Sequence, residues 1–372
     1  MVTVVGIDTH KNTHTLVAVD GLGRRLQELT VEARPSGHEK VLAWLSSQGA
    51  VKVAVEDCRH LSRALEVDLL LAGHQVVRVH TRLMAGMRRG ARERGKSDPI
   101  DAEAVARVAL REDDLPTAVL AGPERDLKLL ADHRRSMVAR RSALQSKLRW
   151  FLHEIDPAIE VPSRALRRYC VLNSLQEQLA GRDGVVVEIA ADMIAEIVSL
   201  TRRINELEAR LGRLVRTEYP HLLAVDGLGV LGAATIVGET AGAARFHSKD
   251  AFARFNGTAP IPVWSGNHER FRLNRGGNRT INTALHMAAV TQQRLGYEGA
   301  DYVAKQLARG KTHTEAMRLL RRRISDRVFA ALRADEKAKE SPIDLRHRPG
   351  PEPVLEVAAC HRSIGELDPR NR

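Results

Sequence analysis

The chain has 372 residues, enough for about two or three domains with separate cores, and its formal net charge of +12 and pI near 10.0 predict a polyanionic partner. Nucleic acid is the first candidate, and an anionic membrane surface is the alternative. No stretch approaches the roughly 20 apolar residues of a membrane-spanning helix, and the three cysteines are not spaced as a disulfide framework or a zinc finger requires, so we expect a cytoplasmic, nucleoid-associated protein without a membrane partner.

The first segment of the chain predicts a buried strand that ends in an acid. Residues 2–7 are almost continuously apolar, as in a central strand covered on both faces, and Asp8 follows them. The elements predicted after it are strands at 14–19 and 24–31, a helix at 36–48, a strand at 52–56 that ends in Glu56, a helix at 61–72 and a strand at 75–79. This order is that of the ribonuclease H fold, which brings the ends of its first and fourth strands together.

A third acidic element lies at residues 96–102, which predict a helix start with a proline in its first turn. Asp98 and Asp101 are three residues apart and therefore share a helix face. Together with Asp8 and Glu56 they can converge on one point, where like charges need cations, and oxygen ligands suit Mg²⁺ or Mn²⁺. Taken singly, each acid is better interpreted as an ordinary carboxylate facing water, whereas the whole set in this order favours a metal site.

Prolines and glycine between about residues 112 and 123 mark a boundary, and a strongly helical segment follows to about 217. Arg134, Arg135 and Arg141 on its first helix can follow a phosphate backbone, although such a run is usually a solvated face. The two helices can form an antiparallel hairpin, one of them can form a coiled coil with another protomer, or the apolar stripes are only a bundle core. Those stripes lie at heptad spacing and consist of Leu130, Met137, Leu144 and Phe151 on the helix at 124–153, and Ala190, Met193, Ile197, Leu200, Ile204, Leu207, Leu211 and Leu214 on the second helix.

The last part of the chain begins near residue 219 and contains two candidate nucleic-acid elements. Gly227 and Gly229 precede a helix in the pattern of a helix-hairpin-helix, whose free backbone amides bind phosphate, although a simple interhelical turn explains them equally well. Residues 255–279 predict an exposed loop that contains Ser265, although in isolation a Ser-Gly pair is usually a turn. The basic residues after the serine can hold a phosphate and neutralise charge developing on it; they are Arg270, Arg272, Arg275 and Arg279.

Two sets of motifs stand out. The first consists of Gly6-Ile7-Asp8-Thr9-His10-Lys11, Val55-Glu56 and Lys96-Ser97-Asp98-Pro99-Ile100-Asp101-Ala102. The second consists of the residues that lead to Ser265-Gly266 and the helix start Gly277-Asn278-Arg279. Together they resemble the DEDD transposases of bacterial insertion sequences, the bridge-RNA-guided serine recombinase group that is related to Piv-type DNA invertases. The resemblance covers residues 2–330. It implies a RuvC-like site in which Mg²⁺, with Mn²⁺ as the alternative, is held by Asp8, Glu56, Asp98 and Asp101. It further implies a covalent phosphoserine bond between Ser265 and DNA, with acids and serine supplied by different protomers.

The predicted fold is α/β plus α. A RuvC-like DEDD domain with the ribonuclease H fold is expected at 1–115, followed by a helical coiled-coil segment at 120–217. A mainly helical C-terminal transposase domain with the serine loop is expected at 218–335, and a flexible tail at 336–372. The predicted function is a DNA transposase or recombinase that acts on element ends and target DNA as a dimer or tetramer, with a structured guide RNA that chooses the target. Lys11 joins the predicted nucleic-acid contacts. The alternatives are a metal-dependent, junction-resolving endonuclease with water as the nucleophile, and a non-enzymatic coiled-coil DNA architectural protein.

Overall fold

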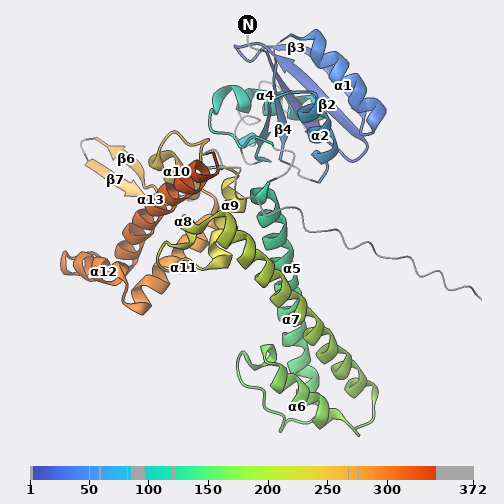
Figure 1. Ribbon diagram of the computed structural model, residues 1–372, viewed down its shortest axis with the longest axis vertical. Helices are drawn as coiled ribbons and strands as arrows, with labels where there is room; N and C mark the ends of the chain where they lie inside the picture. The colour runs from blue at the N-terminus through green and yellow to red at the C-terminus, as the bar shows by residue number, and fades with distance from the viewer. Residues whose placement is uncertain are drawn as a thin grey trace, which may run out of the picture.

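The computed structural model describes residues 3–49, 51–57, 60–81, 83–84, 97–118, 122–266, 268–274 and 276–340 of the chain. An N-terminal part built around a five-stranded sheet lies at one end, a pair of long helices extends away from it, and a mainly helical C-terminal part packs beside the start of that pair (Figure 1). The predicted α/β sheet followed by a mostly helical remainder is therefore confirmed. Residues 341–372, which make up most of the predicted tail, lie outside the described residues.

The N-terminal sheet has the strand order β3-β2-β1-β4-β5, which is the order of the ribonuclease H fold. Its antiparallel meander consists of β1 (Thr3–Thr9), β2 (Thr13–Val19) and β3 (Arg25–Glu32). After it come α1 (Pro35–Ser47), the parallel strand β4 (Val51–Glu56), α2 (Arg63–Leu71) and the parallel strand β5 (Val76–Val79). The pairing of β1 with β4 sets Ile7 beside Val55, so the next residues, Asp8 and Glu56, lie at the same edge of the sheet.

β1 separates two apolar layers, because successive side chains of a strand point to opposite faces of the sheet. Val5 packs in the layer formed with α1 and α2, whereas Val4 packs with α4 (Asp98–Arg111) on the other face. Gly6 and Asp8 share the face of Val4, and a Cβ on Gly6 would lie 2.1 Å from the carbonyl oxygen of Ala102. Glycine alone permits this approach. Gly6 therefore lets α4 pack against β1 and brings the first turn of α4 toward Asp8.

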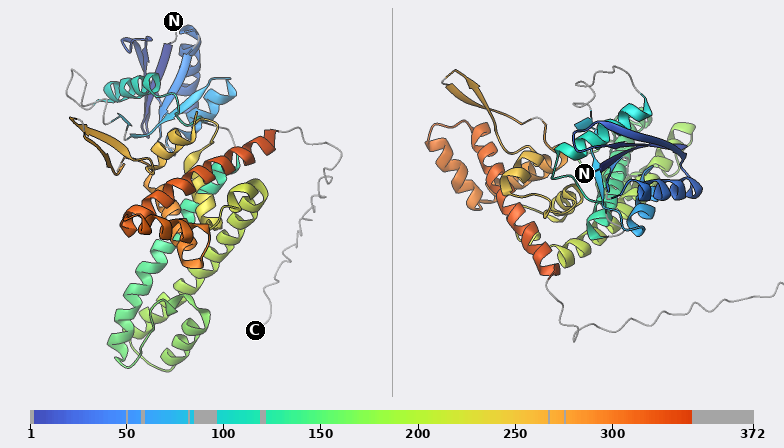
Figure 2. Two further views of the ribbon diagram at one scale, coloured as in Figure 1. Left: turned by 90° about the vertical axis from the view of Figure 1, so that its left-hand side faces the viewer. Right: turned by 90° about the horizontal axis from the view of Figure 1, so that it is seen from above.

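The long helices α5 (Pro123–Ile155) and α7 (Val185–Glu218) lie side by side in antiparallel orientation, joined through η1 (Ala165–Arg167) and α6 (Tyr169–Leu179) (Figures 1 and 2). Ion pairs from Arg134 to Glu208 and from Arg140 to Glu196 connect them. On the predicted apolar stripe of α7, six side chains are buried, and Leu207 and Leu214 are half-buried. Within the chain this stripe packs on α5, on α6 toward the tip, and on the core of the C-terminal part at Leu211 and Leu214.

The C-terminal part is built from α8 (Pro220–Leu223), α9 (Val230–Thr240), α10 (Lys249–Asn256), α11 (Arg279–Leu295), α12 (Glu298–Ala308) and α13 (His313–Glu340). Phe252, Leu285 and Val328 are fully buried in its shared core. α9 also packs directly on α5, since a Cβ on Gly238 would lie 2.8 Å from the Cα of Lys128. None of the helices within the described ranges is both long enough and apolar enough to cross a bilayer.

The prediction of an exposed loop at 255–279 is wrong at its centre, which forms a β-hairpin. β6 (Ile261–Ser265) pairs antiparallel with β7 (His268–Arg272), and Gly266 takes a φ of 58° in the turn between them. Pro262 suggested a loop, but each strand of a two-stranded sheet has a free edge on which the missing N–H of a proline is tolerated. The hairpin projects from the C-terminal part in every view of Figures 1 and 2.

Candidate active site

The four predicted acids gather where the ends of β1 and β4 meet the first turn of α4. Asp8 and Glu56 share the sheet face that α4 covers, since Ala54, two residues before Glu56, packs in that layer. Asp8 and Asp101 are 3% and 5% exposed, whereas half of the Asp98 side chain is exposed. The cluster is therefore closed behind Asp8 and open to solvent at Asp98.

Asp8 is a buried carboxylate that lies among other carboxyl groups. Its pKa is raised from 3.8 to about 7, first by burial and then by the neighbouring carboxyl group of Glu56, while Asp101 adds a smaller repulsion and His10 partly opposes the rise. Asp8 Oδ2 is buried and has no hydrogen-bond partner among the described residues. Because a buried carboxylate in this setting is destabilising unless a cation lies against it, the acids fit a divalent cation.

His10 joins the acids, although its motif predicted a site role only for Asp8. Its Nδ1 lies 3.5 Å from Asp8 Oδ2 and 3.7 Å from Asp98 Oδ2. One ligand atom from each of these three residues lies within 4.8 Å of the others, a spacing that can hold a metal ion, and the carboxylate oxygens suit Mg²⁺ or Mn²⁺. The signal in the sequence was the two-residue step from Asp8, which puts both side chains on one face of an extended segment.

Ser265 lies on a separate element from the acids. It ends β6, opposite His268 in the register of the hairpin. In Figure 1 and in the right-hand view of Figure 2 the hairpin stands apart from β1, β4 and α4, so the element that carries the serine is not adjacent to those that carry the acids in one chain. The side chains of Ser265 and Arg270, and the whole of Arg275, lie outside the described residues. Lys11 is exposed in the turn after β1, at the acidic edge of the sheet.

A basic cluster borders the base of the hairpin. A cavity of about 230 Å³ there is lined by four basic side chains and one acidic one: Arg272, Lys311, Arg318, Arg321 and Glu315. Arg321 is half-buried and donates from Nη1 to Asn282 Oδ1 at 3.0 Å. Burial and the charges of Arg318 and Arg279 lower the pKa of Arg321. Because an anion would relieve this repulsion, the cluster can hold a phosphate group.

The three predicted arginines of α5 differ in their partners. Arg134 donates to Glu208 Oε1 from Nε at 2.9 Å and from Nη2 at 2.6 Å, and so ties α5 to α7. Arg135 pairs with an acid one turn away on an exposed face. Arg141 is 8% exposed; its Nη1 donates to Thr201 Oγ1 at 3.3 Å, and its Nε has no partner within the described part of the chain. Arg134 is therefore a structural residue, and Arg141 keeps unused hydrogen-bonding capacity.

Packing explains Gly227 better than phosphate binding does. Its φ is 77°, and a Cβ there would lie 2.5 Å from the carbonyl oxygen of Ala288 on α11. Gln292 donates to the carbonyl oxygen of Asp226 at 2.6 Å, which holds the same turn against α11. Gly229 caps α9, and a Cβ there would meet nothing within 4 Å. Since α8 has only four residues, the simple interhelical turn describes this segment better than a helix-hairpin-helix.

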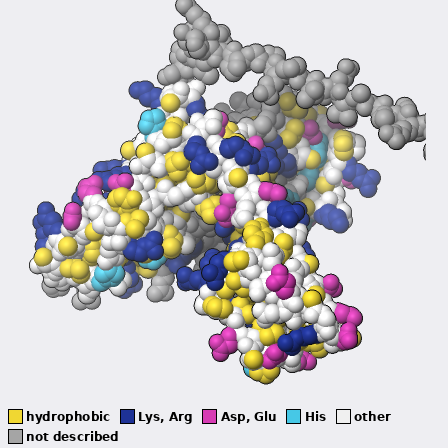
Figure 3. Space-filling view, turned by 60° about the horizontal axis from the view of Figure 1, so that its bottom comes forward, with side chains coloured by type: hydrophobic (Ala, Val, Ile, Leu, Met, Phe, Trp, Pro, Cys, Tyr) yellow, Lys and Arg dark blue, Asp and Glu magenta, His cyan; other side chains and the backbone are white. Residues whose placement is uncertain are grey.

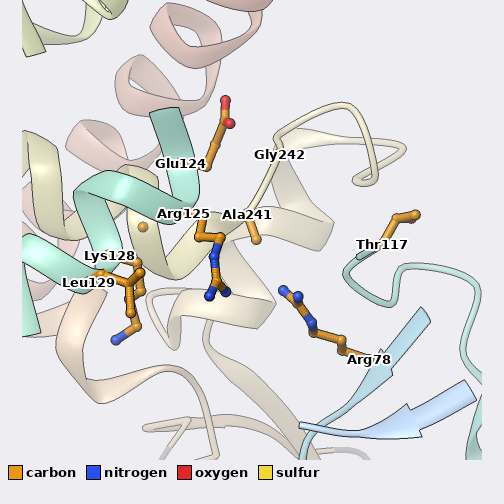
Figure 4. Close-up of a pocket in the computed structure, with 9 residues that line it drawn as sticks. Arg78, Thr117, Glu124, Arg125, Lys128, Leu129, Ala241 and Gly242 are labelled. Carbon is orange, nitrogen blue, oxygen red and sulfur yellow. The ribbon is translucent and has the colours of Figure 1, made fainter. Parts of the chain in front are cut away.

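A second cavity, of about 250 Å³, lies where β5 meets the start of α5 and the end of α9 (Figure 4). Arg78 and Arg125 point toward the same space in this view. Arg78, however, donates to both carboxylate oxygens of Glu66 at 3.1 and 2.6 Å, and Lys128 pairs with Glu239. These charges are engaged within the protein, so we interpret the cavity as a junction between the N-terminal and C-terminal parts.

Two family models match the chain. The DEDD transposase model of IS110 matches residues 5–157, and a model described as "Transposase IS116/IS110/IS902 family" matches residues 219–304. The chain belongs to the IS110/IS116 family of DEDD transposases. The first match contains the acids of this transposase and the second contains its serine hairpin. The transposase resemblance of the two motif sets is thereby confirmed.

The chain is similar to curated proteins of insertion elements and, over part of its length, to a solved structure. The transposase is 27% identical to an uncharacterized 44.8 kDa protein of insertion element IS116 from Streptomyces clavuligerus. The match covers 88% of this chain and 94% of that protein. An uncharacterized 43.6 kDa protein of IS110 from Streptomyces coelicolor is 29% identical over 44% of this chain and 42% of its own length. Among solved structures, T. thermophilus RuvC in complex with Holliday junction substrate is 22% identical, with 30% of this chain and 94% of that chain covered and a TM-score of 0.25.

Proposed function

We propose that this transposase cleaves and rejoins DNA strands at the ends of its insertion element and at the target, with divalent cations at its four acids and Ser265 as the nucleophile. The observation that carries the proposal is the buried Oδ2 of Asp8, which accepts no hydrogen bond from the described residues and lies beside the other acids and His10. A group with so strongly shifted a pKa in an open cluster is typical of a functional site, because the folded protein gains nothing from the repulsion.

The acid cluster supplies the metal ligands in this proposal. The residues that would hold Mg²⁺, or Mn²⁺ as the alternative, are Asp8, Glu56, Asp98 and Asp101; the bound ions supply Lewis-acid stabilisation of charge on phosphate oxygens. β1 fixes Asp8 at the closed back of the cluster, and the half-exposed Asp98 faces the side from which a phosphate enters. His10, close to both carboxylates, keeps them in position.

Ser265 supplies the nucleophile. Its Oγ attacks the scissile phosphorus: the Oγ–P bond forms as one P–O bond of the DNA strand breaks, the serine proton passes to a base, and the released strand oxygen takes up a proton. Attack by the hydroxyl of another strand end reverses these steps, rejoins DNA and frees the serine. The basic cluster lies at the base of the hairpin, at the opposite end of β6 from Ser265, so Arg272, Arg318 and Arg321 can bind the DNA backbone beside the scissile phosphate.

Acids and serine come from different protomers of a dimer or tetramer in this proposal. Two observations support it. The hairpin stands apart from β1, β4 and α4 of its own chain in Figure 1 and in the right-hand view of Figure 2. Trp264 and Phe271 on the hairpin are 66% and 63% exposed, and neighbouring apolar side chains of this size indicate a surface that a partner covers.

A structured guide RNA chooses the target in this proposal. The family resemblance and the net charge of +12 support an RNA partner beside DNA. Figure 3 shows Lys and Arg side chains over the body of the molecule and at its junction with the projecting helices, while acidic side chains surround the tip of those helices. Basic surfaces of this kind bind phosphate backbones without reading sequence, which leaves the choice of bases to pairing between nucleic acids.

A junction-resolving endonuclease with water as the nucleophile is the second candidate, favoured by the separation of Ser265 from the acids within the chain. A non-enzymatic architectural protein is disfavoured, because the repulsion at Asp8 would then serve no purpose.

A denaturing gel of protein incubated with labelled element-end DNA, candidate RNA and Mg²⁺ separates these functions. A protein-linked strand that disappears in Ser265→Ala and persists in the matched control Ser47→Ala supports the transposase mechanism. Free cut ends that persist in Ser265→Ala support the endonuclease, and Asp8→Asn should abolish either product. A wild-type protein that binds the DNA and never cuts it would contradict both.

A further inference from the structure

A second candidate anion site lies on the helical pair, away from the acids. An open cavity of about 610 Å³ separates the middle of α5 from residues 163–167. Ser142, Ser146 and Gln145 contribute neutral polar groups to its wall. Among the described residues that line it there is no acid, and four are arginines: Arg141, Arg149, Arg164 and Arg167.

The segment that carries Arg164 and Arg167 is held in place by α5. Arg149 donates from Nη2 to the carbonyl oxygen of Pro162 at 2.9 Å, and Gln145 donates to the carbonyl oxygen of Leu166 at 2.7 Å. Leu166 is 1% exposed and packs in the core between α5, α6 and α7. Arg164 and Arg167 themselves remain exposed at the cavity. Because the backbone is already ordered, binding an anion there requires little further ordering.

Arg141 has the properties of a cation that lacks its anion. It is 8% exposed, and its buried Nε has no partner within the described ranges. Burial and the charges of Arg167 and Arg134 lower its pKa, while Glu208, which opposes this shift, is already bound by Arg134. A buried guanidinium that faces like charge is destabilised until an anion reaches it.

Trp150 favours a nucleic-acid strand over a free phosphate ion. It follows Ser146 by one helical turn on α5, and it is 76% exposed. An exposed indole beside an arginine-lined cavity suits stacking on an unpaired base while the arginines bind the flanking phosphates.

We propose that Arg141, Arg164 and Arg167 bind backbone phosphates of an unpaired nucleic-acid strand, and that Trp150 stacks on one of its bases. The inference rests on the proposed function only in that a nucleic acid is present; this site holds a strand and cuts nothing. Ser142 lies roughly 30 Å along α5 from Pro123, so the strand is anchored well away from the N-terminal sheet. RNA and DNA offer the same phosphodiester chemistry, and a comparison of single-stranded RNA with single-stranded DNA distinguishes them.

Fluorescence anisotropy in EDTA measures binding without cleavage, with labelled single-stranded RNA of about 20 nucleotides, DNA of the same sequence, and the DNA duplex. Arg164→Ala/Arg167→Ala should weaken single-strand binding at least about tenfold and reduce the slope of log K against log salt by about 1.4. The matched control Arg210→Ala/Arg213→Ala removes the same charge from exposed positions of α7 outside the cavity, and should change the affinity less than about twofold.

Trp150→Ala should weaken single-strand binding about fivefold or more and leave the salt slope unchanged, because stacking releases no counterions. The single strand with the larger loss in Arg164→Ala/Arg167→Ala identifies the natural ligand as RNA or DNA, and unchanged circular dichroism shows that the variants fold.

Equal losses in the two double variants, or a loss confined to duplex DNA, would overturn the proposal. Because every measurement is made in EDTA, its outcome does not depend on whether Ser265 or the acids cleave DNA. A wild type that never cleaves would contradict the proposed function alone.

Discussion

Asp8→Asn removes the buried charge at the centre of the acid cluster and keeps the shape of the side chain. The pKa of Asp8 is raised from 3.8 to about 7. By linkage this shift lowers the stability of the metal-free protein by about 4 kcal/mol at pH 8, where both states ionise, and by about 2 kcal/mol at pH 5, where only the unfolded chain does. Below about pH 4 the Asp8 carboxyl group is protonated in the folded and the unfolded protein, so the pKa shift does not change the free energy of unfolding. The stability that the bound proton contributes is lost as the pH rises through about 7. The variant should therefore gain between about 2 and 3 kcal/mol more stability at pH 8 than at pH 5, while cleavage is lost.

Urea unfolding in EDTA at the two pH values measures this difference. Trp44 packs against the core of the sheet, so its fluorescence follows the N-terminal part when the exposed Trp150 and Trp264 are replaced by Phe. Asp20→Asn is the matched control. The Asp20 carboxylate accepts the backbone N–H of Arg24 at 2.8 Å, a bond that lowers its pKa, so this variant should lose stability equally at pH 5 and pH 8.

An Asp8→Asn effect that is the same at pH 5 and pH 8, or that is destabilising at pH 8, would refute the view that Asp8 is buried among like charges. Mg²⁺ gives an independent check. It should stabilise the wild type, because it binds the folded acids, and should stabilise Asp8→Asn much less.

Three further changes test the fold and the site. Gly6→Ala should destabilise the N-terminal part by about 2 kcal/mol or more, because the new Cβ would lie 2.1 Å from the Ala102 carbonyl oxygen. In the control Gly229→Ala the new Cβ meets nothing within 4 Å. Comparable losses of stability for the two variants in urea unfolding would contradict the close packing of Gly6. His10→Ala should raise the Mg²⁺ concentration for half-maximal cleavage about tenfold, and an unchanged requirement would remove His10 from the site. Glu66→Gln should cost about 3 kcal/mol in the same unfolding assay, since it leaves the Arg78 guanidinium buried without its acid; a loss below about 1 kcal/mol would show that water replaces the pair.

The positions of the acids could be predicted because they follow from local rules. Parallel pairing puts the ends of β1 and β4 at one edge, and alternation along each strand puts Asp8 and Glu56 on one face. Helix periodicity does the same for Asp98 and Asp101. His10 could have been found by the same alternation, but its motif was interpreted only through its carboxylate.

Other features depend on contacts between segments that are far apart in the chain. Arg141 has the sequence context of a surface cation and is buried where α5 packs against α7, with Thr201 within hydrogen-bond distance. The positive φ of Gly227 is required by α11, some sixty residues later in the chain. The hairpin around Ser265 could not be predicted because prolines in a sequence usually indicate a loop. A proline is tolerated in a strand only where that strand has a free edge, which the sequence does not show.

α5 runs without interruption through its 33 residues, Pro123–Ile155, which corresponds to a length of about 50 Å. Its early turns pack against α9, and its middle carries the arginine-lined cavity. One added residue between these points would advance the distal half by about 1.5 Å and rotate it by about 100°. The number of residues in α5 therefore sets the distance and the orientation of the bound strand relative to the rest of the protein. Insertions in α5 should for this reason be tolerated far less well than insertions at the tip of the hairpin.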